Sequence, residues 1–193
     1  MAISDTSKVL FENRIVETKD ENIFIYDNFY AGSGVGLGDI NNDGLPDIYF
    51  CGNQVNDKLY LNKGGFEFED ITEASGISKY DEGWSSSISL VDINQDGFLD
   101  LFVTKELYDD LPNARRDKLY VNQGDNTFVE MAEKVGLGDT IRTRGAAFFD
   151  YDKDNDLDVF LLHQPPNPGV YSKYRAMSDD GRLLSEKYAP RLY

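Results

Sequence analysis

Short apolar runs alternate along most of this chain with segments rich in Gly, Asn and Asp. The runs are of strand length and contain many β-branched and aromatic residues, and some alternate apolar with polar positions, as in "KLYLN" and "FEFEDIT". Runs of this kind, bounded by turn-forming residues, are typical of short β-strands. The pattern therefore predicts an all-β chain.

The strand pattern repeats along the chain. An acidic stretch begins at Asp39 ("DINNDGLPDIYF"), at Asp92 ("DINQDGFLDLFV") and at Asp150 ("DYDKDNDLDVFL"), in steps of 53 and 58 residues. A second block, "KLYLNKGGFEFEDITEASGI" from Lys58, aligns without a gap with "KLYVNQGDNTFVEMAEKVGL" from Lys118. Two motifs that recur in the same order predict a repeat architecture. Since each repeat offers four strands, the predicted fold is a partial β-propeller of about three four-stranded blades.

The repeats divide the chain into an N-terminal segment and three blades. In the segment, residues 1–30, the run "VLFENRIVE" (9–17) is expected to be an outer strand borrowed to close another blade. The final "RLY" matches the start of the second block, so we expect the sequence to stop part-way through a repeat. The blades are assigned to residues 31–77, 78–140 and 141–193.

Two longer segments, 105–118 and 163–190, separate the second and third strands of the later repeats. Their proline and charged residues place them outside the sheets, with a helical turn expected in each. Several tyrosines outside the repeated motifs could stack on sugars or contact a protein, although packing at the blade edge is the commoner role. These tyrosines are Tyr26, Tyr30, Tyr108, Tyr171 and Tyr174.

Acidic residues outnumber basic ones by 35 to 19, which gives a formal net charge of −16. This excess argues against nucleic acid or an anionic membrane as a partner, because both need a basic surface. The single cysteine, Cys51, excludes an internal disulfide and is expected to pack as a small apolar group. No run approaches the roughly 20 apolar residues of a membrane span, and no signal peptide is visible.

The acidic stretches crowd carboxylates, which repel one another unless a cation or a solvated turn offsets the repulsion. Each stretch has Asp or Asn at positions 1, 3, 5 and 9, counted from its first Asp. Calcium takes six to eight oxygen ligands at about 2.3–2.6 Å, and alternating side chains in a tight turn could surround one ion. The predicted side-chain ligands are Asp39, Asn41, Asp43 and Asp47; Asp92, Asn94, Asp96 and Asp100; and Asp150, Asp152, Asp154 and Asp158.

Positions 6 and 7 complete the predicted cage and bring the expected number of calcium sites to about three. Position 6 has to tolerate a positive φ angle, for which Gly is best and Asn next. This position is occupied by Gly44, Gly97 and Asn155. Position 7 could offer a backbone carbonyl, and Asp156 would add a carboxylate. The position 7 residues are Leu45, Phe98 and Asp156.

Other known kinds of acidic loop fit these stretches less well. An EF-hand needs a bidentate Glu at position 12 and helices on both sides, whereas position 12 is here Phe50, Val103 or Leu161. Dockerin-type loops fail for the same reason. Magnesium seldom uses an all-protein cage, and zinc would need His or Cys. An Asx-rich turn without an ion remains the alternative.

The chain resembles FG-GAP/VCBS repeats, the calcium-loop blades of integrin α-subunit propellers, and in particular exported bacterial proteins of the ASPIC/UnbV, cartilage-acidic-protein-like group. The motifs that carry the resemblance are "GSGVGLGDINNDGLPDIYFCGN", "KLYLNKGGFEFEDITEASGI" and "AAFFDYDKDNDLDVFLL". The resemblance implies a seven-bladed propeller, an acidic loop between the first two strands of each blade, and an extracellular, cell-surface or periplasmic location. Only about three blades are present, and the C-terminal domain of the ASPIC/UnbV group is absent.

Catalytic signals are scarce, so the chain is not expected to be an enzyme. A Ser-His-Asp arrangement would have to use the only histidine, His163, and there is no nucleophile motif. The Gly-rich stretch at 31–39 lacks the Lys of a phosphate-binding loop. The favoured hypothesis is a calcium-stabilised module that binds a protein or carbohydrate and is completed by further blades. The alternatives are a fragment of a propeller enzyme, such as a polysaccharide lyase, and a purely structural repeat.

Overall fold

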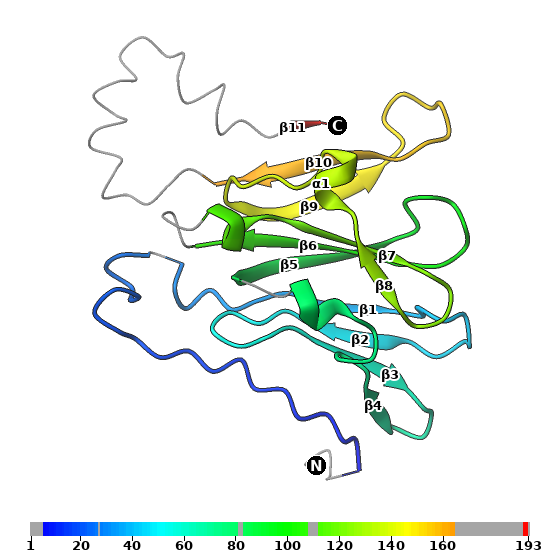
Figure 1. Cartoon of the computed structure of the whole chain (residues 1–193), viewed down its shortest axis with the longest axis horizontal. Helices are drawn as coiled ribbons and strands as arrows, with labels where there is room; N and C mark the ends of the chain where they lie inside the picture. Colours follow the sequence, from blue (N-terminus) through cyan, green and yellow to red (C-terminus); the bar gives the residue numbers. More distant parts are fainter. Residues whose placement is uncertain (1–5, 27, 81–82, 108–111, 165–190, 193) are drawn as a thin grey trace.

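The structure is a computed structural model that describes residues 6–26, 28–80, 83–107, 112–164 and 191–192. These residues form three antiparallel sheets, which Figure 1 shows stacked one above another. The arrangement confirms the predicted all-β, partial-propeller fold with four-stranded blades. The boundaries of the blades, and the number of blades in a complete ring, stay predictions.

Each sheet is a simple meander of neighbouring strands. The first has the order β1-β2-β3-β4 and the second β5-β6-β7-β8, while the third contains β9, β10 and β11 among the described residues. The strands are β1 (Val35–Gly38), β2 (Asp47–Phe50), β3 (Lys58–Asn62), β4 (Phe68–Asp70), β5 (Trp84–Val91), β6 (Asp100–Glu106), β7 (Lys118–Asn122), β8 (Phe128–Glu130), β9 (Thr143–Phe149), β10 (Asp158–His163) and β11 (Arg191–Leu192). The short helical elements are η1 (Ile77–Tyr80), η2 (Pro112–Arg115) and α1 (Ala132–Val135).

Every acidic stretch joins the first and second strands of its sheet, as the resemblance implied. In each sheet the last residue of the first strand pairs with position 9 of the loop, which begins the second strand. Figure 1 shows that the three loops lie at the same end of the stacked sheets. The pairs are Gly38 with Asp47, Val91 with Asp100, and Phe149 with Asp158.

The first strands of successive blades lie next to each other, β1 against β5 and β5 against β9. Glycine makes the approach of the first blade to β5 possible. A Cβ at Gly34 would lie 2.9 Å from the Cα of Ser87, and a Cβ at Gly36 would lie 2.4 Å from Leu90 Cδ1. The Gly-rich stretch is therefore a packing strand, in agreement with its rejection as a phosphate-binding loop.

Two apolar clusters fill the seams between neighbouring blades. The seam between the first two blades contains Leu59 and Ile77 from one side and Leu101 and Phe128 from the other. Cys51 is fully buried in the same cluster, as expected for a small apolar group. The seam between the second and third blades is built on the cluster Phe102, Leu119, Ala132, Leu137, Val159 and Leu161. These two clusters contain most of the buried hydrophobic residues in the described part of the chain.

The N-terminal segment forms no strand with the described sheets at residues 9–17, and its predicted role as an outer strand of another blade stays a prediction. The segment runs in extended form along the first blade instead (Figure 1). The ring of Phe11 stacks on Phe50 with a centroid distance of 4.8 Å, and Asn13 donates to Asn53. These contacts with the first blade use side chains rather than a continuous backbone ladder.

The longer connections agree with the sequence where they are described. In the segment 105–118 the predicted helical turn is η2, whereas the helical turn expected in 163–190 lies outside the described residues. Residues Arg191 and Leu192 pair with Leu161 and Phe160 of β10 and so begin a third strand, in agreement with the alignment of this segment with the second block. No helix in the described part of the chain has the length and apolar character needed to cross a membrane.

Candidate metal centres

The first acidic loop is held in a tight turn by its own carboxylates. Oδ1 and Oδ2 of Asp39 accept the backbone N–H groups of Asp43 at 3.0 Å and Gly44 at 2.7 Å. Oδ1 of Asp43 accepts the N–H of Leu45 at 2.9 Å. These bonds draw positions 1 and 5 towards the inside of the turn, where a cation would need them.

The same frame is found in the other two loops. In the second, Asp92 accepts the N–H groups of Asp96 at 3.0 Å and Gly97 at 2.8 Å. In the third, Asp150 accepts the position 6 N–H of Asn155 at 3.2 Å, and its other bond, at 2.6 Å, comes from position 4 rather than position 5. Position 5 accepts the N–H of position 7 in every loop. The repeated sequence thus specifies one repeated backbone shape.

Backbone angles confirm the expectation for position 6 and add a second special position. Position 6 has a φ of 86° at Gly44, 90° at Gly97 and 73° at Asn155, all in the left-handed region. Position 4 is also left-handed in all three loops, which the sequence analysis did not foresee. Its φ is 60° at Asn42, 58° at Gln95 and 66° at Lys153.

Position 9 has a structural role that the sequence analysis missed. Asp47 is buried, and its two carboxylate oxygens accept the N–H groups of Ile40 at 3.0 Å and Asn62 at 2.8 Å. Asp100 repeats both bonds in the second blade. Burial raises the pKa of both carboxyl groups. Each carboxylate oxygen has a second lone pair, so this role is compatible with a ligand role at the same position.

The Asn of the "KLYxN" motif connects the third strand to the acidic loop. Asn62 donates from Nδ2 to the carbonyl of Pro46 at 3.0 Å, and Asn122 donates to the equivalent carbonyl of Leu99 at 3.1 Å. Asn122 also donates to the carbonyl of Ile40 in the preceding blade, at 2.8 Å. The second repeated motif therefore supports the first, which explains why the two recur together.

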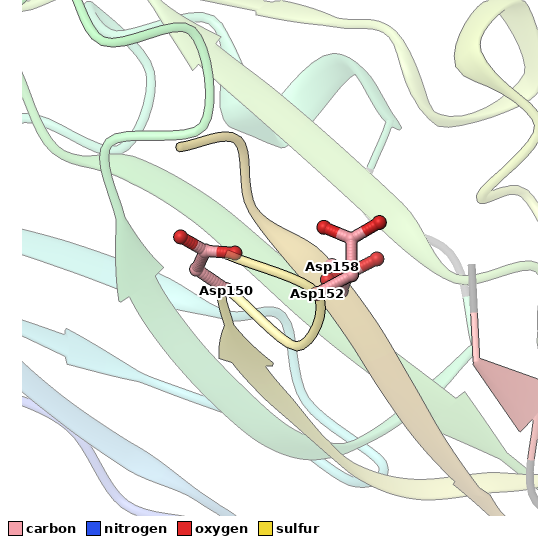
Figure 2. Close-up of side chains that lie close together, drawn as sticks. All are labelled: Asp150, Asp152 and Asp158. Atoms are coloured by element: carbon pink, nitrogen blue, oxygen red, sulfur yellow. The ribbon is translucent and has the colours of Figure 1, made fainter. Parts of the chain in front are cut away.

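The third loop brings three carboxylates together. Figure 2 shows Asp150, Asp152 and Asp158 around the turn between β9 and β10, and they can offer oxygens that all lie within 4.8 Å of one another. Among the described residues this is the one group of three or more His, Cys, Asp or Glu side chains that is close enough to share a metal ion. The first two loops have Asn at position 3 and therefore carry fewer carboxylates.

Crowding in the third loop raises the pKa of two carboxyl groups. Loss of solvation and the neighbouring Asp154 raise the pKa of Asp152. A hydrogen bond to Asp154 and its negative charge raise the pKa of Asp156. Both shifts show that a nearby negative charge makes ionisation harder, which is the repulsion that a bound cation would relieve.

The chemistry of the available donors fits a hard cation. Positions 1, 3, 5 and 9 offer only carboxylate and amide oxygens, and no His or Cys lies within the three loops. Carboxylate and amide oxygens are the ligands that calcium prefers in proteins, in tight turns with a glycine-like bend. The side chains could hold one calcium ion in each loop. A bound ion would supply positive charge that cross-links the turn.

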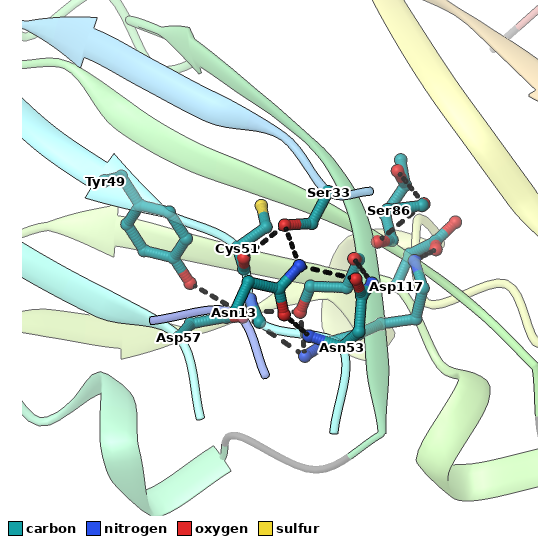
Figure 3. Close-up of polar contacts among 12 residues, drawn as sticks. Asn13, Ser33, Tyr49, Cys51, Asn53, Asp57, Ser86 and Asp117 are labelled. Carbon is teal, nitrogen blue, oxygen red and sulfur yellow. Dashed lines mark hydrogen bonds and ion pairs between the residues drawn. The ribbon is translucent and has the colours of Figure 1, made fainter. Parts of the chain in front are cut away.

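A different polar network, without the arrangement of a metal centre, lies at the opposite end of the blades. Asp57 is buried and accepts hydrogen bonds from Gly52 N–H at 2.6 Å, Tyr49 Oη at 2.8 Å and Ser85 Oγ at 2.8 Å (Figure 3). The buried Nζ of Lys105 lies 3.5 Å from Asp57 Oδ2. Because the ammonium group of Lys105 already offsets the charge of Asp57, this network has a structural role in the seam between the blades.

His163 does not form a catalytic triad with Thr143 and Asp139. Its Nδ1 lies 3.4 Å from Thr143 Oγ1 and its Nε2 lies 3.6 Å from Asp139 Oδ2, which superficially resembles a triad. Thr143, however, is fully buried and donates its hydroxyl to Asp117 at 2.7 Å. A substrate could not reach this hydroxyl, and a nucleophile needs both access and a free base.

Two arginines and one of the tyrosines singled out in the sequence, Tyr26, have structural roles. Arg144 pairs with buried Glu106 at 2.9 Å, and Arg142 lies over the ring of Tyr26 at 5.2 Å from its centroid. Tyr26 is fully buried beside Trp84, so packing is its role. Tyr30 is 61% exposed and remains available to a ligand. The other three tyrosines, Tyr108, Tyr171 and Tyr174, lie outside the described residues.

Comparison with protein families agrees with the repeated loops and strands. The model of the FG-GAP-like repeat matches residues 39–103 and 110–161, which is more than half of the chain. The chain belongs to the FG-GAP-like repeat family. The first matched segment begins with the first acidic loop and includes the second, and the second matched segment includes the third loop, so this FG-GAP chain is recognised by the elements that form the candidate sites.

Curated relatives of this FG-GAP chain include two kinds of protein. Cartilage acidic protein 1 of Xenopus tropicalis is 33% identical over 137 residues, 69% of this chain and 20% of the relative, and the Homo sapiens protein is 29% identical over 81% of this chain and 24% of the relative. Integrin alpha-3 of Cricetulus griseus is 30% identical over 67% of this chain and 13% of the relative. The chain therefore spans a quarter or less of the relatives that it matches.

Proposed function

We propose that this chain is a calcium-binding propeller module that acts outside the cell or at its surface, where it binds a protein or a glycan. The observation that carries the proposal is the threefold repetition of one loop frame with an oxygen-only donor set. A single Asx-rich turn would need no ion, but three copies that keep the carboxylate spacing and the left-handed bend favour a common ligand. In this proposal the calcium is structural.

The proposed ligands in each loop are the side chains at positions 1, 3, 5 and 9 and the backbone carbonyl at position 7. The third loop carries the most negative charge, so we expect it to have the highest affinity. Extracellular modules often bind calcium with a Kd of about 10⁻⁴–10⁻³ M. The names of the relatives, which include cartilage acidic protein and integrin, support an extracellular or cell-surface setting and a protein partner. A glycan partner and a seven-bladed ring are further parts of the proposal.

Thermal unfolding with and without calcium tests the proposal. We expect 5 mM CaCl₂ to raise the melting temperature of the 193-residue chain relative to 1 mM EDTA, because a ligand that binds only the folded state stabilises it by mass action. Magnesium at the same concentration is the matched control and should have a smaller effect. Superimposable curves in calcium and EDTA would contradict the proposal.

Stoichiometry tests the assigned ligands. Asp92→Ala or Asp96→Ala should remove one calcium equivalent in isothermal titration calorimetry and leave the other loops active. Asp125→Ala is the matched control, because Asp125 is an exposed carboxylate outside the three loops that accepts hydrogen bonds from nearby Thr127. An unchanged stoichiometry in both loop variants would show that the second loop is not a calcium site.

A further inference from the structure

The acidic loops of neighbouring blades are joined by a repeated hydrogen bond. Nδ2 of Asn42 in the first loop donates to the carbonyl of Gly97 in the second at 2.9 Å. Nε2 of Gln95 in the second loop donates to the carbonyl of Asn155 in the third at 2.8 Å. In both cases a side-chain amide at position 4 reaches position 6 of the next loop, so this contact follows the repeat.

The left-handed backbone at position 4 is part of this contact. Position 4 lies between the candidate ligands at positions 3 and 5, and its backbone has a positive φ angle. The side chain at position 4 is exposed. A ligand role would require this side chain to face the centre of its own loop, whereas the amides of Asn42 and Gln95 bond to the neighbouring loop. Position 4 is therefore a connector and not a member of the cage.

The acceptor belongs to a peptide unit that also contacts a candidate ligand. The peptide between Gly97 and Phe98 accepts the Asn42 amide at its carbonyl and donates its N–H to the carboxylate of Asp96, at 2.9 Å. One peptide unit thus connects the first loop to a ligand of the second. Hydrogen bonds in such a series polarise and orient one another.

The second junction repeats this series. The peptide between Asn155 and Asp156 accepts the Gln95 amide and donates its N–H to the carboxylate of Asp154, at 3.1 Å. The orientation of Asp154 is therefore connected to Gln95, which lies next to the candidate ligand Asp96. Together the two junctions form a continuous path from the first loop to the third.

We propose that Asn42 and Gln95 are positioning residues that couple cation binding between successive loops. Ordering of Asp96 in the second loop fixes the Gly97 carbonyl, and this fixes the turn that holds Asn41 and Asp43 in the first. Because a loop that is already ordered loses less conformational entropy on binding, the coupling is positive. This inference rests on the proposed calcium function and adds cooperativity to it.

The third loop supplies a natural contrast. Its position 4 residue is Lys153, an ammonium donor with a longer and more flexible side chain than Asn or Gln. We expect the loops joined by an amide to be coupled, and Lys153 to have no influence on the affinities of the first two loops.

A double-mutant cycle followed by NMR tests the coupling. Calcium is titrated into the ¹⁵N-labelled 193-residue chain, and the amide signal of Gly44 reports the occupancy of the first loop. Asp92→Asn disables the second loop, and Asn42→Gly removes the connecting amide while keeping a residue that accepts positive φ. Four chains are compared: the unmodified chain, each single variant and the double variant.

In the chain that keeps Asn42, we expect Asp92→Asn to weaken calcium binding in the first loop by about fivefold, which is the lower end of typical couplings between two binding sites. In the Asn42→Gly background, the same substitution should weaken calcium binding in the first loop by much less. The charge that Asp92→Asn removes acts equally in both backgrounds, so the cycle cancels it. Gln123→Ala is the matched control, because its amide bonds within its own hairpin to Val121 at 2.9 Å.

The outcomes separate the coupling from the calcium function. If the Gly44 signal does not respond to calcium in any chain, the proposed function fails. If it responds, but Asp92→Asn has the same effect with and without Asn42, the coupling is refuted while the calcium site stands. Gln95→Gly, followed at the amide of Asn155, gives a second cycle in case Asn42→Gly is too unstable to measure.

Discussion

The two seams between blades share the same hydrogen bonds to a buried aspartate but differ in the basic residue beside it. Asp57 and Asp117 each precede a third strand at equivalent positions of the repeat, and both are buried. Each accepts a backbone N–H from the end of the second strand of its blade, from Gly52 at 2.6 Å and from Lys105 at 2.8 Å. The backbone hydrogen bond to the buried aspartate is therefore the same in both seams.

The hydroxyl contacts are constant as well. Asp57 accepts a hydrogen bond from Ser85 at 2.8 Å, and Asp117 accepts one from Thr143 at 2.7 Å, both from the first strand of the next blade. The cation differs. The first seam contains the fully buried Lys105, and the equivalent position in the second seam is His163. The comparison teaches that the repeat preserves the contacts that close each seam, whereas the group that offsets the buried charge varies.

The apolar parts of the seams differ in a second way. In the first seam, Phe128 from the fourth strand of the second blade is buried, and its N–H donates to the carbonyl of Ser75 at 2.9 Å. In the second, the equivalent surface around Leu119, Val121 and Leu137 lines a groove of about 470 Å³. The described part of the third blade has no fourth strand that could supply an aromatic residue there.

Removing the carboxylate of the first seam should have the largest effect. We expect Asp57→Ala to lower the free energy of unfolding by about 4 kcal/mol, because it removes the carboxylate that lies 3.5 Å from the buried ammonium of Lys105. Urea denaturation measures this loss. Lys105→Met is the paired variant and should cost less, since Asp57 would keep three hydrogen-bond donors.

The equivalent change in the second seam sharpens the comparison. Asp117→Ala should cost only about 2 kcal/mol, because it leaves hydrogen-bond donors unsatisfied but no directly paired lysine ammonium. If Asp117→Ala costs as much as Asp57→Ala, the ion pair is not what distinguishes the two seams.

Emptying the apolar part of the first seam should have the next largest effect. Phe128→Ala should cost about 3 kcal/mol in urea denaturation, because it opens a cavity in the buried cluster that also contains Ile77 and Tyr120. Phe66→Ala is the matched control, since Phe66 is 65% exposed, and it should change stability by less than about 0.5 kcal/mol. Equal losses in the two variants would mean that Phe128 does not hold the seam together.

The strands and the shape of the acidic loops could be predicted from sequence because both depend on local chemistry. Residue spacing specified the turn, and the tolerance of Gly and Asn for positive φ identified position 6 at Gly44, Gly97 and Asn155. The candidate ligands at positions 1 and 5 also lie where the repeat placed them. No strand forms over 9–17 with the described sheets, because an alternating pattern does not reveal whether a backbone partner is available within the chain, and its place in another blade stays a prediction.

Contacts between blades could not be predicted, because they join residues far apart in the sequence. The buried role of Asp47 depends on an N–H that only the folded third strand brings near, and the amide of Asn42 meets its acceptor 55 residues away. One feature of the sequence does indicate a contact between blades. Asp57 and Asp117 both directly precede the aligned "KLY" motif, and a repeated Asp outside the acidic loops indicates a structural contact.

The last and smallest effect is a change in pH dependence at the second seam. Burial raises the pKa of Asp117 well above its ordinary value. Its contribution to stability is therefore fully present below the unfolded pKa of about 3.9 and is lost as the pH rises through the folded pKa. Asp117→Asn imitates the protonated acid, and Thr143 can donate instead to the carbonyl of Ile141, 3.1 Å away. We expect the stability of the Asn variant relative to the unmodified chain to increase from pH 4 to pH 7.

The exposed carboxylate of Asp125 is the control, because its pKa is shifted in the opposite direction to that of Asp117. Hydrogen bonds from Thr127 lower the pKa of Asp125, so its contribution is present above the unfolded pKa and is lost as the pH falls. Asp125→Asn should therefore lose stability relative to the unmodified chain as the pH rises from below that pKa. Urea denaturation at a series of pH values measures both differences, in EDTA so that calcium does not contribute. If the stability difference between Asp117→Asn and the unmodified chain stays constant with pH, this buried carboxyl has the same pKa in the folded and unfolded chain. The second seam would then need no proton on Asp117 to offset its charge.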